Sequence, residues 1–391
     1  MEASRPSVLH VSKLYWPWIG GVERVVQDIA EGVAGEFISR VLVCEPRGSA
    51  EAGWVNGVEV IRAASVGMFL SMPVSLSFPL LFRKLATRAD IVHMHLPFPL
   101  ATMAWRRRAR TGLIVTYHSD IVRQQWLFPL YGPLLKRVLH DADVILVSSP
   151  ILIQRSTWLR PHAHKCRVVP LFVDLRDYPI HLDGVTEARE LDFQSGMQFV
   201  LFVGRLVYYK GLEYLIRAMQ HVDATLVIVG DGPLRKELER LSRELRVDHK
   251  VRFAGRVPTE TLHKYYRACL CLVLPSVERS EAFGVVQLEA MAYGKPVVNT
   301  SLPTGVPFVS VHGETGLTVP PRDPSALAEA LNRLCREEEL RRRLGRQARK
   351  RVETMFSKDV ILTQIKSIYR ELLRQRPRGR EMCRCAACQS G

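Results

Sequence analysis

Short continuous runs of apolar residues recur along the chain, and between them lie stretches in which apolar residues recur at helical spacing. Continuous apolar runs of this length are typical of β-strands that are covered on both faces. The stretch from Gly20 to Val33 shows the helical spacing and is predicted as a helix. In the first half of the chain the pattern predicts strands over 8–12, 40–44, 58–61, 90–94, 113–117, 144–148 and 167–169.

The second half of the chain repeats this plan. Strands and helices that alternate in this way favour parallel sheets, and two successive sets favour two Rossmann-like domains. Beyond residue 320 the chain is helical and charged, and the helix predicted over 358–373 is amphipathic. The strands predicted for the second half are 199–203, 224–229, 251–254, 270–274, 296–299 and 315–319.

We therefore expect an α/β fold with two Rossmann-like domains whose parallel sheets face each other across a cleft. The N-terminal domain is predicted over 1–172 and the C-terminal domain over 173–357, with a polar link at 174–196. The helix at 358–375 is expected to return to the N-terminal domain, and 376–391 to be a basic, disordered tail. Because ligands bind at the carboxyl ends of such strands, the cleft is the predicted site.

Composition supports a folded protein with an anionic partner. A chain of 391 residues is long for one domain. Its hydrophobic fraction of 47% and charged fraction of 24% are those of a globular protein. The net charge of +16 favours a polyanion, an anionic membrane surface or a phosphorylated substrate. We do not expect nucleic acid, because the basic residues are not interleaved with a recognisable binding module.

The cysteines indicate a reducing compartment. They are scattered through the chain, which is not the pattern of a disulfide framework. Cys383, Cys385 and Cys388 could bind a soft metal, but no fourth ligand follows or precedes them nearby. An unstructured tail is therefore the preferred interpretation. No signal peptide is expected at the start, and a cytoplasmic location follows. The cysteines are Cys44, Cys166, Cys269, Cys271, Cys335, Cys383, Cys385 and Cys388.

One uncharged run, over 63–82, has the length of a membrane span. It contains Gly67, Pro73 and Pro79, which make it a poor continuous helix. We interpret it as a loop plus a helix on an apolar surface. The basic cluster of Arg106, Arg107, Arg108 and Arg110 belongs to the same domain. Together they predict a face that docks on an anionic membrane, with an ordinary solvated helix end as the alternative.

The segment from Glu281 to Glu289 carries the most informative chemistry. It follows a predicted strand and contains a short loop and a helix start, which together can seat an anion. Glu281 is expected in the loop and Glu289 more than a turn inside the helix. Carboxylates on both sides of a phosphate-binding site could accept hydrogen bonds from a sugar on one side and from a ribose on the other.

Two further strand ends carry groups that suit a diphosphate. Arg205 and Lys210 follow the strand at 199–203, where they can reach the cleft. Fixed cations of this kind can stabilise a departing diphosphate without a metal. Gly20 and Gly21 follow the first strand and let the backbone approach a ligand closely.

These motifs, in this order and at these strand ends, resemble the retaining GT-B glycosyltransferases of family 4, also called glycosyl transferases group 1. The resemblance extends from about Val8 to Leu373. The stretches 8–13, 302–307 and 312–321 look like the mannosyl- and rhamnosyltransferases of bacterial surface-polysaccharide (O-antigen) assembly.

The resemblance implies roles for the residues that match. Glu281 would contact hydroxyls of the donor sugar, and Glu289 would hold both ribose hydroxyls. The catalytic set would be His118, Arg205, Lys210 and Glu281. The donor would be bound by Gly20, Gly21, Phe283, Gly284, Val285, Glu289, Arg256 and Val257.

Within that donor site, the backbone N–H groups of Phe283, Gly284 and Val285 would bind the diphosphate. Arg256 and Val257 would lie at the base, and His118 beside the sugar. Relatives react on the front face of the sugar without a protein nucleophile, a cofactor or a metal. His93 and His95 alternate on one strand and could ligate a metal, but a structural or acceptor-side role is preferred.

The implied function is transfer of a hexose, mannose or rhamnose preferred, from a nucleotide diphosphate sugar to a lipid-linked saccharide. GDP is the preferred nucleotide, with a UDP-sugar-dependent transferase as an alternative. A nucleotide-sugar epimerase on the same fold, which needs no acceptor, also remains open. So does a non-catalytic scaffold that binds membrane.

Overall fold

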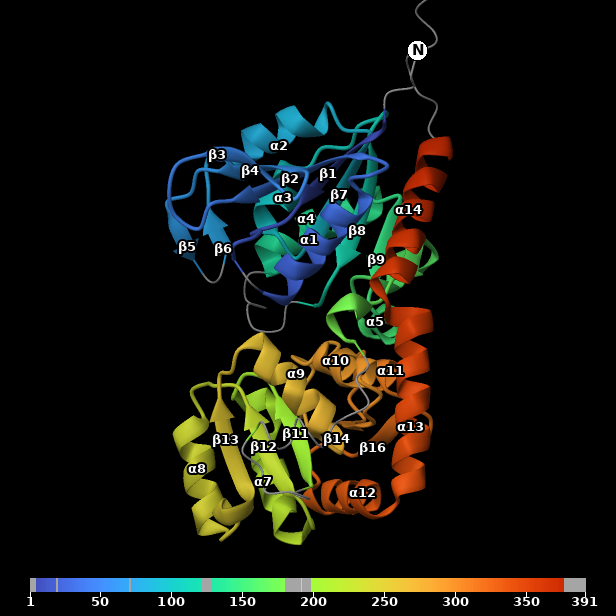
Figure 1. The fold of residues 1–391 in the computed structure, drawn as a ribbon. Coiled ribbons are helices and arrows are strands. Elements are labelled where there is room, and N and C mark those ends of the chain that lie inside the picture. The colour runs from blue at the N-terminus through green and yellow to red at the C-terminus, as the bar shows by residue number, and fades with distance from the viewer. Residues whose placement is uncertain are drawn as a thin grey trace, which may run out of the picture. The chain divides into compact units, whose positions relative to one another are not determined.

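The computed structural model describes residues 5–18, 20–69, 72–120, 128–179, 191 and 198–375 (Figure 1). The chain divides into two compact units. Unit 1 contains the described residues up to Val169 and those from Leu362 onward, and unit 2 is Pro170–Ile361. The boundary predicted between 172 and 173 thus falls between Val169 and Pro170. Most of the predicted link at 174–196 and the whole tail at 376–391, with its three cysteines, lie outside the described residues.

The described part of unit 1 is built on an eight-stranded sheet with the order β10-β9-β8-β7-β1-β2-β4-β3. All neighbouring pairs are parallel except β3 and β4, which are antiparallel. The strands are β1 Ser7–Val11, β2 Ile38–Cys44, β3 Glu51–Val55, β4 Val58–Ala63, β7 Ile91–Leu96, β8 Gly112–Tyr117, β9 Val144–Val147 and β10 Cys166–Val168.

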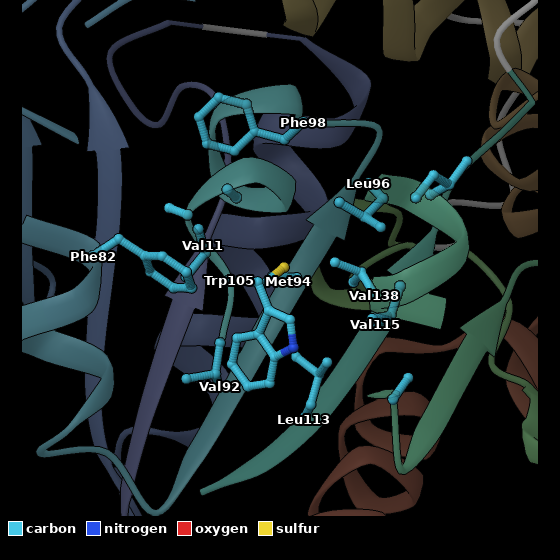
Figure 2. Packing of buried hydrophobic residues seen from close by; sticks show 14 of the residues in the cluster. Val11, Phe82, Val92, Met94, Leu96, Phe98, Trp105, Leu113, Val115 and Val138 are labelled. Atoms are coloured by element: carbon cyan, nitrogen blue, oxygen red, sulfur yellow. The ribbon is translucent and has the colours of Figure 1, made fainter. Parts of the chain in front are cut away.

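Strand alternation sorts the side chains of β7 between the two faces of this sheet. Val92, Met94 and Leu96 face a core that includes Phe82 and Trp105 (Figure 2). The intervening histidines of β7 therefore lie on the opposite face. Before residue 170, the helices among the described residues are α1 Gly21–Val33, α2 Phe78–Ala86, α3 Pro99–Ala104, α4 Phe128–Asp141, α5 Pro150–Arg155 and the 3₁₀ helix η2 Arg160–Lys165.

The helix predicted at the end of the run at 63–82 is present as the start of α2, but the part before it differs from the predicted loop. It contains a short antiparallel hairpin, β5 Gly67–Phe69 and β6 Met72–Val74, before α2 begins. Strands this short give too few positions for a period to be read from the sequence. Within the described part of the chain, no helix is both long and apolar enough to cross a membrane.

The helix α14 Lys358–Gln375 packs on unit 1 with its C-terminal part. Tyr369 is fully buried against His93 of β7, and Gln364 donates to the carbonyl oxygen of Val168. Gly112 of β8 leaves room for Leu372, whose Cδ2 would lie 2.7 Å from an added Cβ. This arrangement agrees with the expected return of the final helix to the first domain.

Unit 2 contains a fully parallel six-stranded sheet with the order β13-β12-β11-β14-β15-β16 among its described residues. The α/β class and the two parallel sheets predicted from the sequence are confirmed. The strands are β11 Phe199–Val203, β12 Thr225–Val229, β13 Val251–Gly255, β14 Cys271–Leu274, β15 Val297–Thr300 and β16 Gly316–Val319.

Helices cover the two apolar faces of this second sheet, and they form the clusters around Phe202 and Phe199. The α-helices are α7 Leu212–Ala218, α8 Arg235–Glu244, α9 Thr259–Ala268, α10 Val286–Ala292, α11 Val306–Val309, α12 Pro324–Arg336 and α13 Glu338–Arg351. The shorter helical segments are η3 Leu175–Asp177, η4 Tyr208–Lys210, η5 Met219–His221, η6 Asp248–Lys250 and the π-helix η7 Val352–Phe356.

Candidate functional site

A buried ion pair joins two of the predicted catalytic residues in unit 2. The Lys210 Nζ lies 2.5 Å from Glu281 Oε2, and both side chains are buried. Ser276 donates its hydroxyl to the same carboxylate oxygen at 2.9 Å. Lys210 follows β11, and Ser276 and Glu281 follow β14, the strand paired with β11. The carboxyl ends of two neighbouring strands thus bring these three residues together.

The turn at Gly211 holds Lys210 in this position. Lys210 ends the 3₁₀ helix η4, and Gly211 then adopts φ +66°. A Cβ on Gly211 would lie 2.2 Å from the carbonyl oxygen of Pro275, just ahead of Ser276. Only glycine permits both the left-handed backbone and this close approach of two chain segments.

The other oxygen of Glu281, Oε1, has no hydrogen bond within the described part of the chain. It is available to accept from a ligand hydroxyl. Arg205 is the second residue after β11, in the loop that leads to η4. It is exposed and carries no ion pair with a described residue. An exposed guanidinium and a buried ammonium therefore lie on one strand-end loop.

The loop before α10 presents backbone donors. Gly284 adopts φ +75°, and a Cβ there would lie 2.6 Å from Leu274 Cδ2. The N–H groups of Phe283, Gly284 and Val285 have no acceptor among the described residues. The buried Gln287 donates to the carbonyl oxygen of Phe283 at 3.0 Å and so helps to hold the loop.

Glu289 lies earlier in its helix than predicted. α10 begins at Val286, so Glu289 falls in the first turn and not more than a turn inside. The loop takes up Phe283 to Val285 because the turn at Gly284 breaks the helical backbone. Tyr266 of α9 donates its hydroxyl to Glu289 Oε2 at 2.5 Å. Burial raises the pKa of Glu289, while this hydrogen bond lowers it.

The predicted base-binding residues follow β13. Arg256 is exposed and has no ion pair or hydrogen bond with a described residue, while Val257 packs partly against an apolar cluster of unit 2. The structure does not bring Arg256 into contact with Lys210 or Glu281. It therefore remains a separate predicted contact.

In unit 1, Gly20 and Gly21 form the start of α1. A Cβ on Gly20 would lie 2.2 Å from Glu23 Oε2, so a larger residue would displace this carboxylate. Glu23 is buried, and its Oε1 lies 3.7 Å from Lys13 Nζ. Gly20 therefore makes room for a buried acid to which the sequence pattern assigned no role, whereas a Cβ on Gly21 would meet no atom within 4 Å.

His118 follows β8 and is half-buried. Its Nε2 lies 3.2 Å from Nδ1 of the buried His95. Burial lowers the pKa of His118 to about 4, and the charge of Lys13 acts in the same direction. Burial also lowers the pKa of His95 well below its usual range. Both imidazoles are therefore neutral at neutral pH.

A third histidine joins His93 and His95 on the same face of the sheet. One ligating nitrogen from each of His10, His93 and His95 lies within 4.8 Å of the others, which is a geometry that could hold a metal ion. However, His93 already contacts Tyr369 Oη and Thr116 Oγ1 at 2.6 Å each. A metal would have to displace one of these two contacts.

The sequence reading missed Ser276, Tyr266 and Glu23. Ser276 follows the apolar strand β14 and precedes the segment from Glu281 to Glu289, so its position in the sequence could have predicted a place in the site. Glu23 is the last residue of the motif that begins with Gly20 and Gly21, so its position could also have predicted a place in the site. Tyr266 lies on a different helix from Glu289, and no local pattern marks it.

Two family descriptions match this chain and together cover most of it. Residues 19–177 match "Glycosyltransferase Family 4", and residues 186–351 match "Glycosyl transferases group 1". The first match falls almost wholly in unit 1, and the second falls in unit 2.

Individual relatives agree with these matches. The chain is 35% identical to the O-antigen chain mannosyltransferase C of Escherichia coli, over 94% of this chain and 98% of the relative. It is 36% identical to the D-rhamnosyltransferase WbpZ of Pseudomonas aeruginosa, over 90% and 92% of the two chains. The solved structure of Anabaena HepE in complex with UDP has a similar fold, with a TM-score of 0.73 and 19% identity over 93% and 100% of the chains.

Proposed function

Because the chain belongs to the group 1 glycosyl transferases of family 4, with the GT-B fold, we propose that it transfers mannose or rhamnose from a GDP-sugar to a lipid-linked saccharide. The acceptor would be a growing surface polysaccharide. Support comes from two relatives, whose names specify an O-antigen mannosyltransferase and a D-rhamnosyltransferase. The proposed place of action is the cytoplasmic face of the inner membrane.

The contact between Lys210, Glu281 and Ser276 is the observation that carries the proposal. It fixes one carboxylate oxygen of Glu281 and leaves the other for a hydroxyl of the donor sugar. A carboxylate held rigidly in this way is preorganised to bind an oxocarbenium-like sugar as positive charge develops on it. In the proposed complex, the ammonium group of Lys210 would lie beside the diphosphate, where negative charge develops.

The proposed chemistry uses the leaving group and not a protein nucleophile. Arg205 and Lys210 stabilise the charge of the departing diphosphate, and Arg205 can bind two phosphate oxygens at once. The leaving phosphate takes the proton of the acceptor hydroxyl as the new bond forms on the same face, which retains the configuration. Lys210 and Ser276 hold Oε2 of Glu281, and we assign the remaining Oε1 to a hydroxyl of the donor sugar and not to attack on the anomeric carbon.

The proposed donor site is completed by backbone and ribose contacts. The N–H groups of Phe283, Gly284 and Val285, which have no acceptor among the described residues, would donate to the diphosphate. Glu289 would accept from both ribose hydroxyls. Arg256 and Val257 would contact the base, Gly20 and Gly21 the phosphate or sugar, and His118 a sugar hydroxyl.

We also propose that transfer needs no metal ion, because two cationic side chains already serve the leaving diphosphate. Dialysis against a chelator should leave the initial rate of transfer unchanged. Loss of activity that returns with added Mg²⁺ or Mn²⁺ would contradict this part of the proposal.

Assays with a panel of nucleotide sugars would determine which donor the protein uses. We expect GDP-mannose or GDP-rhamnose to raise the melting temperature more than UDP-sugars do, and to release GDP only with a lipid-linked saccharide present. The principal competitor is a UDP-sugar donor, because the solved structure of HepE contains UDP. Release of UDP from a UDP-sugar, with no response to GDP-sugars, would replace the preferred donor.

Turnover without any acceptor separates the remaining alternatives. A nucleotide-sugar epimerase would convert its substrate alone, and the product would be a new sugar nucleotide. A non-catalytic scaffold would turn over no member of the panel, with or without acceptor. Either result would replace the transferase proposal.

The acceptor side of the proposal includes a membrane contact by unit 1. Leu76 and Leu80 are 88% and 69% exposed, and the exposed Arg83 and Lys84 follow on the same helix. Arg108 donates to the carbonyl oxygen of Arg83, so the arginine cluster lies against the end of α2. Exposed leucines beside cations suit an interface of acyl chains and anionic headgroups.

A further inference from the structure

Strand register brings His95 and His118 together. β7 and β8 are parallel, and His95 is paired with Thr116. His118 lies two residues beyond Thr116, and alternation therefore directs its side chain to the same face. The backbone N–H of His118 donates to the carbonyl oxygen of Leu96 at 3.1 Å, which extends the pairing by one step. The planes of the two rings are nearly parallel, with 20° between them and 5.5 Å between the ring centroids.

The hydrogen bond between these rings has a direction. A hydrogen bond between two ring nitrogens needs one protonated and one bare nitrogen, and a neutral imidazole offers one of each. Either His95 Nδ1 donates to His118 Nε2, or His118 Nε2 donates to His95 Nδ1. In the first case the proton of His118 lies on Nδ1, and in the second case Nδ1 is bare.

The remaining nitrogen of His95 favours the first arrangement. His95 is only 2% exposed, and its Nε2 has no hydrogen-bond partner among the described residues. If His118 donated, Nε2 of His95 would be a buried N–H group without an acceptor. Among backbone groups, orphaned N–H donors are rarer in folded proteins than under-satisfied carbonyl acceptors, and we apply the same order to the ring nitrogens of His95. A bare nitrogen at Nε2, with the proton on Nδ1, avoids such a donor.

We propose that His95 is a positioning residue that holds His118 in its Nδ1–H tautomer, so that His118 presents a hydrogen-bond donor and not a base to its ligand. His118 Nδ1 has no hydrogen bond with a described residue, so it is the nitrogen left for a ligand. That the ligand is the donor sugar rests on the proposed function. A donor at this point binds a sugar hydroxyl or phosphate oxygen. It agrees with chemistry in which the leaving phosphate, and not His118, takes the acceptor proton.

The tautomer can be measured directly. Long-range ¹H–¹⁵N correlation spectra of the ¹⁵N-histidine-labelled protein distinguish a protonated from a bare ring nitrogen, and His118→Ala assigns the signal. We expect Nδ1 of His118 to be protonated and Nε2 bare in the full chain at neutral pH. Protonation on Nε2 would overturn the proposal, even if every variant failed to fold.

Two variants of His95 test its effect on His118. His95→Gln keeps a side-chain N–H donor for His118 Nε2, whereas His95→Leu removes it. In His95→Leu we expect signals from both tautomers of His118. We also expect kcat to fall by roughly 10- to 100-fold, with little change in KM for the donor. His95→Gln should keep the Nδ1–H tautomer and recover most of kcat. An unchanged tautomer in His95→Leu would refute the positioning role.

Failure of the proposed function gives a different result. If His118→Ala transferred sugar at the full rate, His118 would have no part in the reaction. The spectrum of the wild-type protein would still decide which nitrogen carries the proton. The tautomer and its catalytic use are therefore tested separately.

Discussion

At the scale of single residues, the candidate site depends on which oxygen or nitrogen of each side chain is already occupied. Glu281 has one oxygen held by Lys210 and Ser276, and the other is free of described contacts. Glu289 is held by Tyr266. Groups fixed on one side and open on the other are preorganised for a ligand, because little rotamer entropy is lost when it binds.

Removal of Lys210 should abolish transfer. In Lys210→Ala we expect kcat to fall by at least about 100-fold, because the cation beside the leaving diphosphate is lost. The variant also leaves the buried Glu281 without its ion-pair partner, which costs about 3–5 kcal/mol of stability. Initial rates and urea unfolding at one temperature measure both effects.

Two further variants separate catalysis from stability. The double variant Lys210→Met, Glu281→Gln removes both charges, so it should be more stable than Lys210→Ala while remaining inactive. Lys236→Ala, at an exposed lysine of α8, serves as the surface control and should match the wild type. Near-normal turnover of Lys210→Ala would remove the ion pair from the mechanism.

The pKa of Glu289 predicts a stability effect that depends on pH. Because burial raises this pKa in the folded state, the carboxyl group is easier to ionise in the unfolded chain. The contribution of Glu289 to stability is therefore full below the pKa of the unfolded chain, about 4.3, and declines as pH rises through the folded value. Glu289→Gln does not ionise, so its stability relative to wild type should improve from pH 4 to pH 7.

Urea unfolding of Glu289→Gln at both pH values measures this trend, and KM for the donor should rise because one acceptor for the ribose is lost. Glu329→Gln, at an exposed site on α12, is the matched control and should show neither effect. A constant difference in unfolding free energy across this pH range would show that the folded pKa is not raised.

At the scale of elements, the site is made by loops that leave neighbouring strands at the same edge. The loop after β11 carries Lys210, and the loop after β14 carries Ser276 and Glu281. Gly211 lets the first loop approach the second at Pro275. Because the backbones of these two loops are in contact, there is no room for a side chain at position 211.

Gly211→Ala should therefore destabilise unit 2 and impair transfer. The added Cβ would meet a backbone oxygen at 2.2 Å, and that oxygen cannot rotate away. Gly313→Ala is the matched control, because Gly313 has a similar φ of +74° but no atom within 4 Å of its added Cβ. Differential scanning calorimetry should show Gly211→Ala to be less stable than the control by about 1–3 kcal/mol.

If the two alanine variants lost equal stability, the cost would come from positive φ alone. The close contact at Pro275 would then be relieved by movement of the loop. Transfer rates of the Gly313→Ala variant should stay near the wild-type value, since its added Cβ meets no atom within 4 Å.

At the scale of the whole molecule, charge and exposed apolar side chains determine the proposed surface contact. The chain carries a net charge of +16, and unit 1 places arginines and leucines at the two ends of α2. The free energy of binding an anionic membrane then has an electrostatic part, which salt weakens, and an apolar part, which it does not.

Vesicle co-sedimentation should show both parts. We expect binding to vesicles with anionic lipid that weakens at high salt, and little binding to neutral vesicles. Leu76→Ser combined with Leu80→Ser should reduce binding to anionic vesicles several-fold at low salt, whereas Val360→Ser, at a half-exposed site on α14, should not. Equal binding by both variants would exclude these leucines from the contact.

Local patterns in the sequence were sufficient for most elements because the strands here are short, fully buried and continuous in apolar residues. β3 and the β5–β6 hairpin were not predicted, since an exposed edge strand and three-residue strands lack that pattern. The start of α10 was misplaced for a related reason. Nothing in the residue types around Gly284 shows that its backbone has a positive φ.

The sequence by itself determined the α/β class, the two parallel sheets and the strand ends that carry Arg205, Lys210, Glu281 and His118. These properties depend on residues close together in the chain, where the spacing of apolar residues shows the type of element. Only the tertiary structure decided which side chains meet: Lys210 with Glu281, Tyr266 with Glu289, and His95 with His118. Such pairs depend on strand order, register and helix packing, and these follow from burial summed over the whole domain.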